Sequence, residues 1–316
     1  MSTDTLTDTM AIKRPFLGLL VPQLQEALQA FQASPSKFRV LRTVSSHDLT
    51  PKEASRPSSA DSPKTLFILD SSFNPPSIAH QTLAQSALRN DVSSKHPGPH
   101  RLLLLFATMN ADKAPSAASF DQRLTLMTIF ATDLLESMKD KPHEYSITSV
   151  DIGVTKVPYY TDKSAAIENK GQEWYPNVPK HVHLVGYDTL TRFFAAKYYK
   201  DFNPPFSALN PYFDHGHQLR VTLRPGSDYG TVDEQKAFVK QLEDGGLEAD
   251  GGKKEWARQV QLVPPNEKTG VSSTKIRKAA KAGDWELVRS LCTPRVSEWV
   301  RSEKIYEEDA SGAKMA

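Results

Sequence analysis

The chain has 316 residues and a formal net charge of +2, because 39 Lys and Arg stand against 37 Asp and Glu. A balance this close to zero favours neither a nucleic acid nor a membrane as partner. The single cysteine, Cys292, excludes an internal disulfide framework and favours a reducing compartment. The N-terminus lacks a signal-peptide pattern, and the strongest apolar run, at 102–107, is too short to span a bilayer. We therefore expect a soluble protein of the cytosol or the nucleus.

The first 63 residues predict an extension that precedes the main domain. Residues 17–33 have the period of an amphipathic helix, whose apolar face is formed by Leu20, Leu24, Leu28 and Phe31. A short strand is expected at 38–44, and 45–63 has the Ser- and Pro-rich composition of a linker. We divide the chain into an extension at 1–63, a domain at 64–308 and a tail at 309–316. The apolar helix face would pack on the domain or dock on a partner.

The rest of the chain alternates short apolar strands with amphipathic helices. Strands are expected at 65–69, 101–108, 145–152, 182–185 and 219–223, and helices at 78–89, 120–138, 160–169 and 188–199. This alternation predicts an α/β fold, a doubly wound Rossmann-like parallel sheet with helices on both faces. The segments 201–217 and 244–253 are rich in Pro or Gly and are expected to be surface loops. Ligands of such folds bind at the carboxyl ends of the strands, near the switch in strand order.

The first candidate site follows the strand at 65–69 and reads Asp70-Ser-Ser-Phe-Asn-Pro-Pro-Ser-Ile-Ala-His80. A strand, a Pro-constrained turn and a helix start place free backbone N–H groups and the helix dipole at one point, which favours an anion. His80 would lie on the first turn of that helix, where it could donate to a phosphate oxygen. The alternative is an ordinary turn with His80 at the surface, because short motifs often match by chance.

The second candidate site, Val271-Ser-Ser-Thr-Lys-Ile-Arg277, lies near the end of the chain. Ser272 or Ser273 would cap a helix, and Lys275 and Arg277 add positive charge that suits a triphosphate. Alone, the same pattern is more typical of a capped helix with a solvated basic face.

The remaining histidines and the cysteine are weaker candidates. His181 and His183 would share one face of a strand as packed side chains, and 214–217 is expected to be a solvated turn. No carboxylate or cysteine cluster supports a metal site at His181 and His183, and 214–217 could hold a metal only weakly, so we predict no metal site. Cys292 is expected in the core rather than as a nucleophile.

Taken together, the two motifs resemble the G-x-F-x-P-x-[HT]-x-x-H and I-S-S-T-x-I-R signatures of HIGH-motif nucleotidyltransferases. Four segments between them are similar to nicotinamide-nucleotide adenylyltransferases: Lys113 with 120–124 (Lys…R-x-x-M), 157–162 (P-x-Y-T), 184–190 (G-x-D-x-L) and 224–226 (R-x-G). The resemblance covers 65–306, leaves out the extension, and is nearest to a divergent fungal-type branch. Ser71 departs from the usual Gly, and Ser77 from the usual His or Thr.

The resemblance implies a set of site residues. Catalytic roles are implied for His80, Lys113 and Arg277. ATP contacts are implied for Ser72, Phe73, Ser77, His80, Gly186, Asp188, Arg224, Ser272, Ser273, Thr274 and Arg277. Mononucleotide contacts are implied for Ser72, Phe73, Lys113, Tyr160 and Thr161. Mg²⁺ would arrive with ATP and bridge phosphate oxygens mainly through water, so no carboxylate cage is expected.

The resemblance also implies the reaction, in which ATP donates its adenylyl group to nicotinamide mononucleotide or nicotinic acid mononucleotide, giving NAD or its acid form and pyrophosphate. The expected partners are these two nucleotides, with no nucleic acid and no membrane, and a homo-oligomer is left open. Three alternatives stay open. One is a nucleotide-binding regulator, one is an enzyme with another acceptor such as phosphopantetheine or with cytidylyl transfer, and the last is an aminoacyl-tRNA synthetase fragment.

Overall fold

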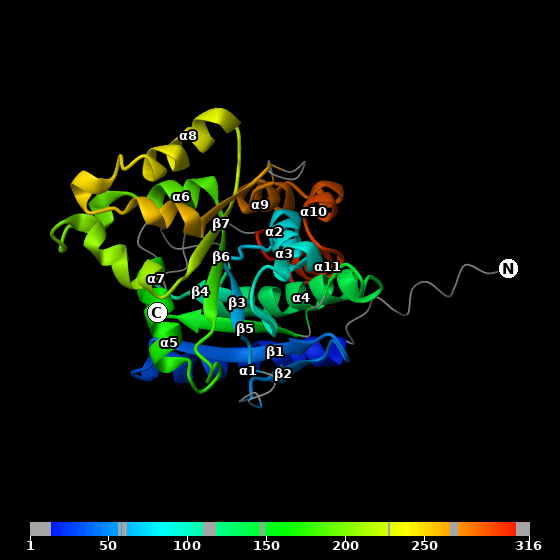
Figure 1. Cartoon of the computed structure of the whole chain (residues 1–316). Coiled ribbons are helices and arrows are strands. Elements are labelled where there is room, and N and C mark those ends of the chain that lie inside the picture. The colour runs from blue at the N-terminus through cyan, green and yellow to red at the C-terminus, as the bar shows by residue number, and fades with distance from the viewer. Residues whose placement is uncertain are drawn as a thin grey trace.

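An eight-stranded sheet forms the centre of the molecule, in the order β2-β1-β5-β4-β3-β6-β7-β8 (Figure 1). The computed structural model describes residues 14–55, 58, 62–109, 118–145, 147, 149–226, 228–265 and 271–307. The strands are β1 (Phe38–Ser45), β2 (Pro51–Glu53), β3 (Thr65–Asp70), β4 (His100–Ala107), β5 (Ser149–Thr155), β6 (Lys180–Gly186), β7 (Gln218–Thr222) and β8 (Val260–Val263). Strands β3 to β8 run parallel, whereas β1 pairs antiparallel with β5 and β2. The expected α/β fold is thereby confirmed.

Helices cover both faces of this sheet. They are α1 (Arg14–Ala33), α2 (Ile78–Leu88), α3 (Asn90–Ser93), α4 (Phe120–Lys139), α5 (Tyr160–Lys170), α6 (Tyr187–Phe193), α7 (Asn210–Asp214), α8 (Val232–Glu243), α9 (Ser273–Lys281), α10 (Trp285–Leu291) and α11 (Pro294–Ser302). One core joins α1, α2, α4 and α9–α11 to one face of the sheet, and a second joins α5 to the opposite face. The central strands β3 and β4 are buried on both faces, as their uninterrupted apolar sequence requires. A third core lies around α6, α7 and α8.

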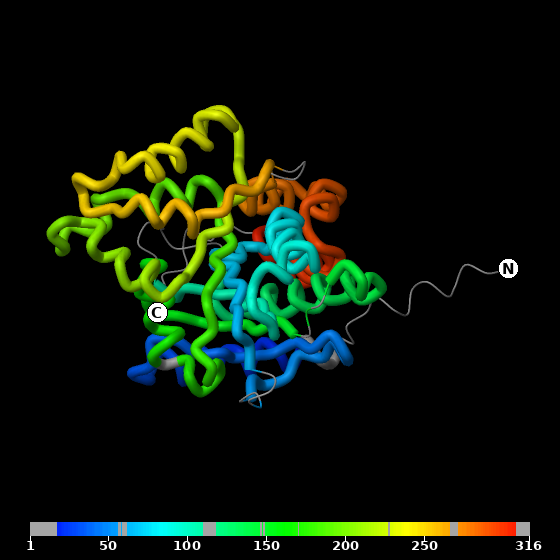
Figure 2. The backbone as a smooth tube through the Cα atoms, in the orientation of Figure 1, coloured from blue at the N-terminus to red at the C-terminus, as the bar shows by residue number. Residues whose placement is uncertain are grey.

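The N-terminal segment contributes to both the sheet and its covering layer. Strand β1 pairs with β5 along its length, and α1 packs against α4, so the blue start of the chain runs beside the green middle (Figure 2). Leu24 and Phe31 are fully buried, which confirms the predicted helix face. The domain boundary at residue 63 stays a prediction.

Several elements differ from the sequence-based expectation. The strand expected at 145–152 begins at Ser149, and all its residues are buried because β5 lies between β1 and β4. Helix α6 ends at Phe193 rather than near 199, and a 3₁₀ turn (Ala196–Tyr198) follows it. Helix α8 and strand β8 were not predicted.

The segment 201–217 is not a surface loop, which corrects that prediction. It forms a 3₁₀ turn (Pro205–Leu209) and α7, and Phe206, Leu209 and Tyr212 are at most 1% exposed. Aromatic side chains make this segment part of the third core, and its prolines stand at the starts of the 3₁₀ turn and of α7. The second expected loop, 244–253, contains the 3₁₀ turn Glu248–Asp250.

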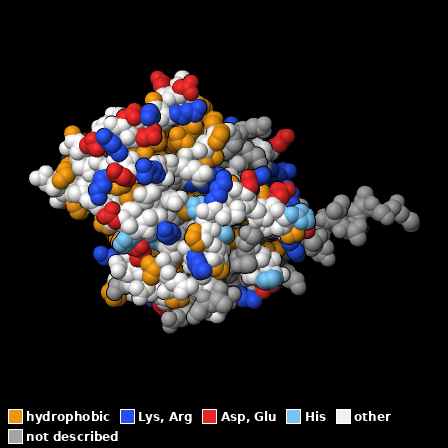
Figure 3. Space-filling model, in the orientation of Figure 1, with side chains coloured by type: hydrophobic (Ala, Val, Ile, Leu, Met, Phe, Trp, Pro, Cys, Tyr) orange, Lys and Arg blue, Asp and Glu red, His pale blue; other side chains and the backbone are white. Residues whose placement is uncertain are grey.

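The surface carries charge of both signs. On the face turned to the viewer, Lys and Arg side chains are interspersed with Asp and Glu side chains (Figure 3). Among the described residues, no helix is both long and apolar enough to cross a membrane.

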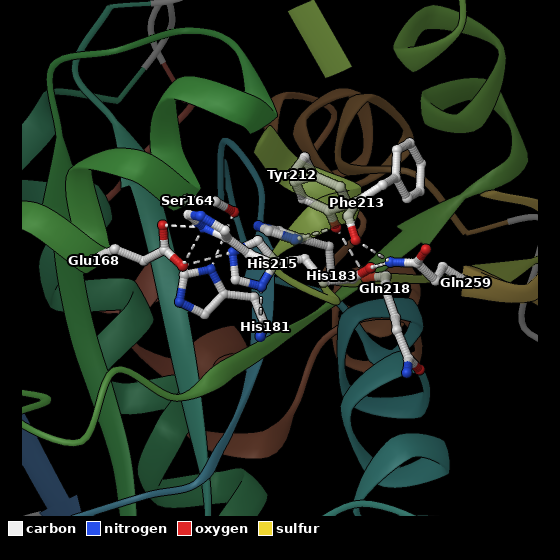
Figure 4. Close-up of polar contacts among 10 residues, drawn as sticks. Ser164, Glu168, His181, His183, Tyr212, Phe213, His215, Gln218 and Gln259 are labelled. Carbon is white, nitrogen blue, oxygen red and sulfur yellow. Dashed lines mark hydrogen bonds and ion pairs between the residues drawn. The ribbon is translucent and has the colours of Figure 1, made fainter. Parts of the chain in front are cut away.

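Two histidines are buried within the sheet layer beneath α5 and α7. His181 and His183 are both 0% exposed and lie on β6, as expected for packed strand side chains. The Nδ1 of His181 is 3.0 Å from the Ser164 hydroxyl, and the Nδ1 of His183 is 2.8 Å from the Tyr212 hydroxyl (Figure 4). Burial holds the pKa of both imidazoles well below its usual range, and the neighbouring His217 adds to this effect. The folded protein therefore favours both rings in the neutral form.

A test of the N-terminal packing uses Phe31→Ala. We expect the free energy of unfolding to fall by about 3–5 kcal/mol, because the change leaves a cavity between α1 and its neighbours. The matched control is Leu19→Ala on the same helix, whose side chain is 64% exposed; it should change stability by less than about 0.5 kcal/mol. Urea unfolding measures both, and equal stabilities would contradict the packing of α1.

The buried histidines predict a loss of stability in mild acid. Their pKa is lowered by folding, so the unfolded chain binds more protons once the pH falls below about 6.5. Stability should be constant above that pH and should fall below it, with a limiting slope of about 1.4 kcal/mol per pH unit for each ring. Urea unfolding at pH 7.5 and 5.5 would measure this. The double variant His181→Asn, His183→Asn should flatten the profile, and the exposed His47→Gln should not.

Candidate functional site

The turn after β3 holds His80 in a defined orientation and protonation state. The backbone N–H of Ser77 donates to His80 Nδ1 at 3.0 Å, and the Ser77 hydroxyl lies 2.9 Å from the same nitrogen. Because Nδ1 accepts from an N–H, the proton of the neutral imidazole must sit on Nε2. His80 therefore presents its Nε2–H as a donor at the N-terminus of α2, where free N–H groups also favour an anion.

Ser71, which departs from the usual glycine, contacts this donor. Its Oγ lies 3.0 Å from His80 Nε2, so the imidazole donates to the serine oxygen in this structure. A phosphate oxygen that takes the same proton must compete with Ser71. The sequence departure thus has a direct structural consequence at the residue expected to carry the chemistry.

The two sequence motifs meet in space. The Ser273 hydroxyl donates to the Pro75 carbonyl at 2.8 Å, although the residues are 198 positions apart. Arg277 donates to the Asn74 carbonyl at 2.8 Å and to the Thr274 hydroxyl at 3.1 Å. Ser272 caps α9 by accepting from the Lys275 N–H at 3.3 Å. The N-termini of α2 and α9 are therefore joined at the turn, with Arg277 between them.

Phe73 anchors the turn through its buried side chain. Its backbone has a φ of 45°, an uncommon conformation for a bulky residue, and its side chain is 0% exposed. The ring lies 5.4 Å from the His80 ring. Such strain is typical of functional turns, where the surrounding structure must maintain it.

A cavity of about 240 Å³ opens beside this turn, at the carboxyl ends of β3 and β6. Strand β3 pairs with β4 on one side and β6 on the other, so the order of the strands switches there. Parallel α/β folds bind ligands at this position. Three of the expected residues line the cavity, Ser72, Tyr160 and Asp188. The other lining residues are Asp70, Ser71, Ala107, Pro158, Tyr159, Lys163, Thr189, Arg192, Phe193, Tyr198 and Tyr199.

A buried ion pair in the cavity wall escaped the sequence analysis. Lys163 donates to the Asp70 carboxylate, and both side chains are less than a tenth exposed. The Lys163 ammonium also lies 4.9 Å from the centre of the Tyr160 ring. Burial raises the pKa of the Tyr160 phenol well above its usual range, and Asp70 and Asp188 raise it further, so Tyr160 is neutral. In the sequence, the three-residue spacing of Tyr160 and Lys163 on one predicted helix was the signal that these two side chains could lie on the same face.

Gly186 lets Asp188 fold back over the end of β6. Gly186 is the N-cap of α6, and a Cβ there would come within 2.7 Å of an Asp188 carboxylate oxygen. Real Cβ atoms do not approach so closely, so a larger residue would displace the carboxylate from its place on the cavity wall.

Two further expected residues, Arg224 and Thr161, lie outside the cavity wall. Arg224 follows β7, where its backbone bonds to Gln235 and its guanidinium lies 5.4 Å from the Tyr229 ring. Thr161 lies on the first turn of α5 without lining the cavity. Lys113 lies outside the described residues.

A group of possible metal ligands lies away from the cavity. The Glu168 carboxylate is 2.9 Å from His215 Nδ1 and 3.0 Å from His217 Nε2, and the three ligand atoms lie within 4.8 Å of one another (Figure 4). His217 is 2% exposed, which corrects the expectation of a solvated turn. The backbone N–H of His181 donates to His217 Nδ1 at 3.1 Å, so the proton of the neutral His217 ring lies on Nε2. A metal at Nε2 of His217 would need that bond to be broken or the ring to be anionic, whereas the observed contact of Nε2 with the Glu168 carboxylate needs neither.

Comparisons with known proteins identify relatives of the chain. No model of a protein family matches it. A Schizosaccharomyces pombe protein named "Putative nicotinamide mononucleotide adenylyltransferase" is 31% identical over 232 residues, which is 73% of this chain and 81% of that protein. The Plasmodium falciparum nicotinic acid mononucleotide adenylyltransferase complexed with NaAD is 13% identical, with a TM-score of 0.45 over 77% of this chain and 98% of that one. Its complex with APC gives 12%, 0.44 and the same coverage.

The relative from S. pombe is similar across nearly three quarters of the chain. On that similarity, the protein belongs to the nicotinamide mononucleotide adenylyltransferase family of nucleotidyltransferases.

Proposed function

We propose that the protein transfers the adenylyl group of ATP to a pyridine mononucleotide, nicotinamide mononucleotide or its acid form, with release of pyrophosphate. The observation that carries this proposal is the contact between the two motifs, in which Arg277 and Ser273 of α9 bind the carbonyls of the turn before His80. Two helix N-termini, a neutral histidine that donates through Nε2 and an arginine thus surround one point. This set of donors suits a polyphosphate.

The cavity beside that point suits the nucleosides. Asp188, held by the fold-back over Gly186, would accept from the ribose hydroxyls of ATP. Tyr160 and the nearby Tyr159 and Tyr199 offer flat aromatic surfaces to a pyridine ring. The Asp70–Lys163 pair satisfies its own charges, so this part of the wall is close to neutral.

The chemistry needs no nucleophile from the protein. The 5′-phosphate of the mononucleotide is already ionised at neutral pH and attacks the α-phosphorus of Mg-ATP, and pyrophosphate leaves. The protein contributes alignment and charge stabilisation. His80 would donate its Nε2 proton in a hydrogen bond to a phosphate oxygen, Arg277 would neutralise charge, and the N–H groups of α9 would bind terminal phosphates. The Ser77 N–H keeps His80 in the required tautomer.

The direct test is an assay of the purified protein with Mg-ATP and each mononucleotide, in which pyrophosphate release is measured for both, and the NAD formed from nicotinamide mononucleotide is also detected through a coupled dehydrogenase. His80→Ala should lower kcat by roughly 10²-fold or more, because one preorganised donor to the transition state is lost. ATP binding without turnover in the wild-type protein would contradict the proposal and favour a binding-only protein. Near-normal turnover of His80→Ala would remove the histidine from the mechanism.

Ser71 provides a second test of the role of His80. Ser71→Ala removes the hydroxyl that accepts from Nε2, so the donor no longer has to leave an internal bond when phosphate arrives. A neutral hydrogen bond is worth about 0.5–1.5 kcal/mol, which predicts a rise in kcat/KM for ATP of about 2- to 10-fold. Ser86→Ala, further along α2, is the matched control and should leave kcat/KM unchanged. A fall in kcat/KM for Ser71→Ala would instead mean that the hydroxyl itself assists catalysis.

A further inference from the structure

The ion pair in the cavity wall has capacity for a ligand. The Lys163 ammonium donates to the Asp70 carboxylate, and the two side chains are 6% and 8% exposed. An ammonium has three donors and a carboxylate has about four acceptor positions, so their mutual bond leaves both groups able to form others. Both residues line the cavity. A donor and an acceptor that are not saturated by each other therefore border the space in which a substrate would lie.

The pair lies next to aromatic side chains on which a flat ring could stack. Asp70 is the last residue of β3, and Lys163 lies in the first turn of α5, which begins at Tyr160. The Lys163 ammonium is 4.9 Å from the centre of the Tyr160 ring. Tyr159 and Tyr199 line the same cavity. A pyridine ring bound against these tyrosines would carry its substituent close to the ion pair.

The two candidate mononucleotides differ only in that substituent. The carboxamide of nicotinamide mononucleotide is neutral and has an N–H donor at one end and a carbonyl acceptor at the other. As an ion pair, Asp70 only accepts and Lys163 only donates, so the pair offers one partner for each end of the carboxamide. The carboxylate of the acid form has no donor, and its charge would lie against that of Asp70. Like charges repel strongly where water is largely excluded.

The other groups around the cavity do not favour an acid either. Asp188 and Arg192 are the remaining charged residues among those that line it, and their charges have opposite signs. The buried His183 ring lies 5.2 Å from the Tyr160 ring, and burial holds the pKa of His183 well below its usual range. The described cavity wall therefore has no excess of positive charge that would attract a carboxylate.

We propose that Asp70 and Lys163 recognise the carboxamide of nicotinamide mononucleotide and select it over the acid form. Asp70 accepts from the amide nitrogen, and Lys163 donates to the amide oxygen. This inference rests on the proposed function, whose acceptor it narrows to the amide. Because one hydrogen bond to a charged group is lost with the acid, kcat/KM should be about 10- to 100-fold higher for the amide.

The test compares the two mononucleotides on the full chain, by pyrophosphate release with Mg-ATP. In Asp70→Asn the repelling charge is gone and the Lys163 charge remains, so the amide-to-acid ratio of kcat/KM should fall by about 10-fold or more. In Lys163→Gln the Asp70 charge remains without its partner, so the ratio should rise. A purely structural role of the pair would lower both activities alike and would leave the ratio unchanged in both variants.

Asp133→Asn is the matched control, because Asp133 is a buried carboxylate that pairs with Arg295 and does not line the cavity. It should leave the ratio as it is in the wild type. A wild-type ratio near one would overturn the inference, as would an unchanged ratio in Asp70→Asn or in Lys163→Gln. If one of these variants does not fold, the wild-type ratio and the other variant decide.

Failure of the proposed function has a different signature. Turnover of both mononucleotides at equal kcat/KM would overturn this inference and leave the adenylyl transfer standing. No pyrophosphate from either mononucleotide would contradict the proposed function. Calorimetric affinities of the same proteins for the two mononucleotides would then replace kcat/KM in the ratio, and equal affinities in the wild type would overturn the inference as well.

Discussion

The contact between the β3–α2 turn and the start of α9 is the constraint on which the site depends. Asn74 accepts from Arg277 through its backbone carbonyl and from Tyr306 through its side chain. The turn after β3, helix α9 and the segment that follows α11 therefore converge on one residue. Helices α9 to α11 pack in the same core as α4 and α2, and that core sets the position of Arg277. A shift of this layer would change the proposed phosphate site even if the sheet stayed intact.

Charge divides the site into two parts. At the turn itself Arg277 adds positive charge, and His80 carries its proton on Nε2. In the cavity wall, the Asp70–Lys163 pair compensates itself and aromatic side chains predominate. This division suits a reaction between two molecules that each carry charge at one end and a flat ring at the other. In the proposed reaction the attacking group belongs to the substrate, so electrostatic preorganisation is the main contribution that such a site would make.

The edges of the sheet explain part of the role of the N-terminal segment. A parallel sheet that ended at β5 would present an unpaired row of backbone groups, which can pair with another chain. Strand β1 covers that edge, and β2, which has only three residues, forms the new one. Helix α1 covers the adjacent apolar face by packing on α4. The segment is therefore part of the folded core.

Local patterns determined much of this protein. The apolar runs of β3, β4, β6 and β7 and the amphipathic α1, α2, α4 and α5 were predicted nearly to their ends, because burial on one or both faces leaves a short-range periodicity. The two motifs were recognised by their residues, and the structure brings them into contact through Ser273 and Arg277. Helix α7 was missed because the prolines of the segment 201–217 suggested a loop, and the burial of the helix depends on aromatic neighbours distant in the sequence.

Only the tertiary structure decided the pairings that no local pattern encodes. The Asp70–Lys163 pair joins residues 93 positions apart, and the Ser71–His80 bond depends on the shape of the turn. Residue types and spacing reveal which groups a site could use. The partners and the protonation of these groups are set by packing between distant segments, which the order of residues along the chain does not show.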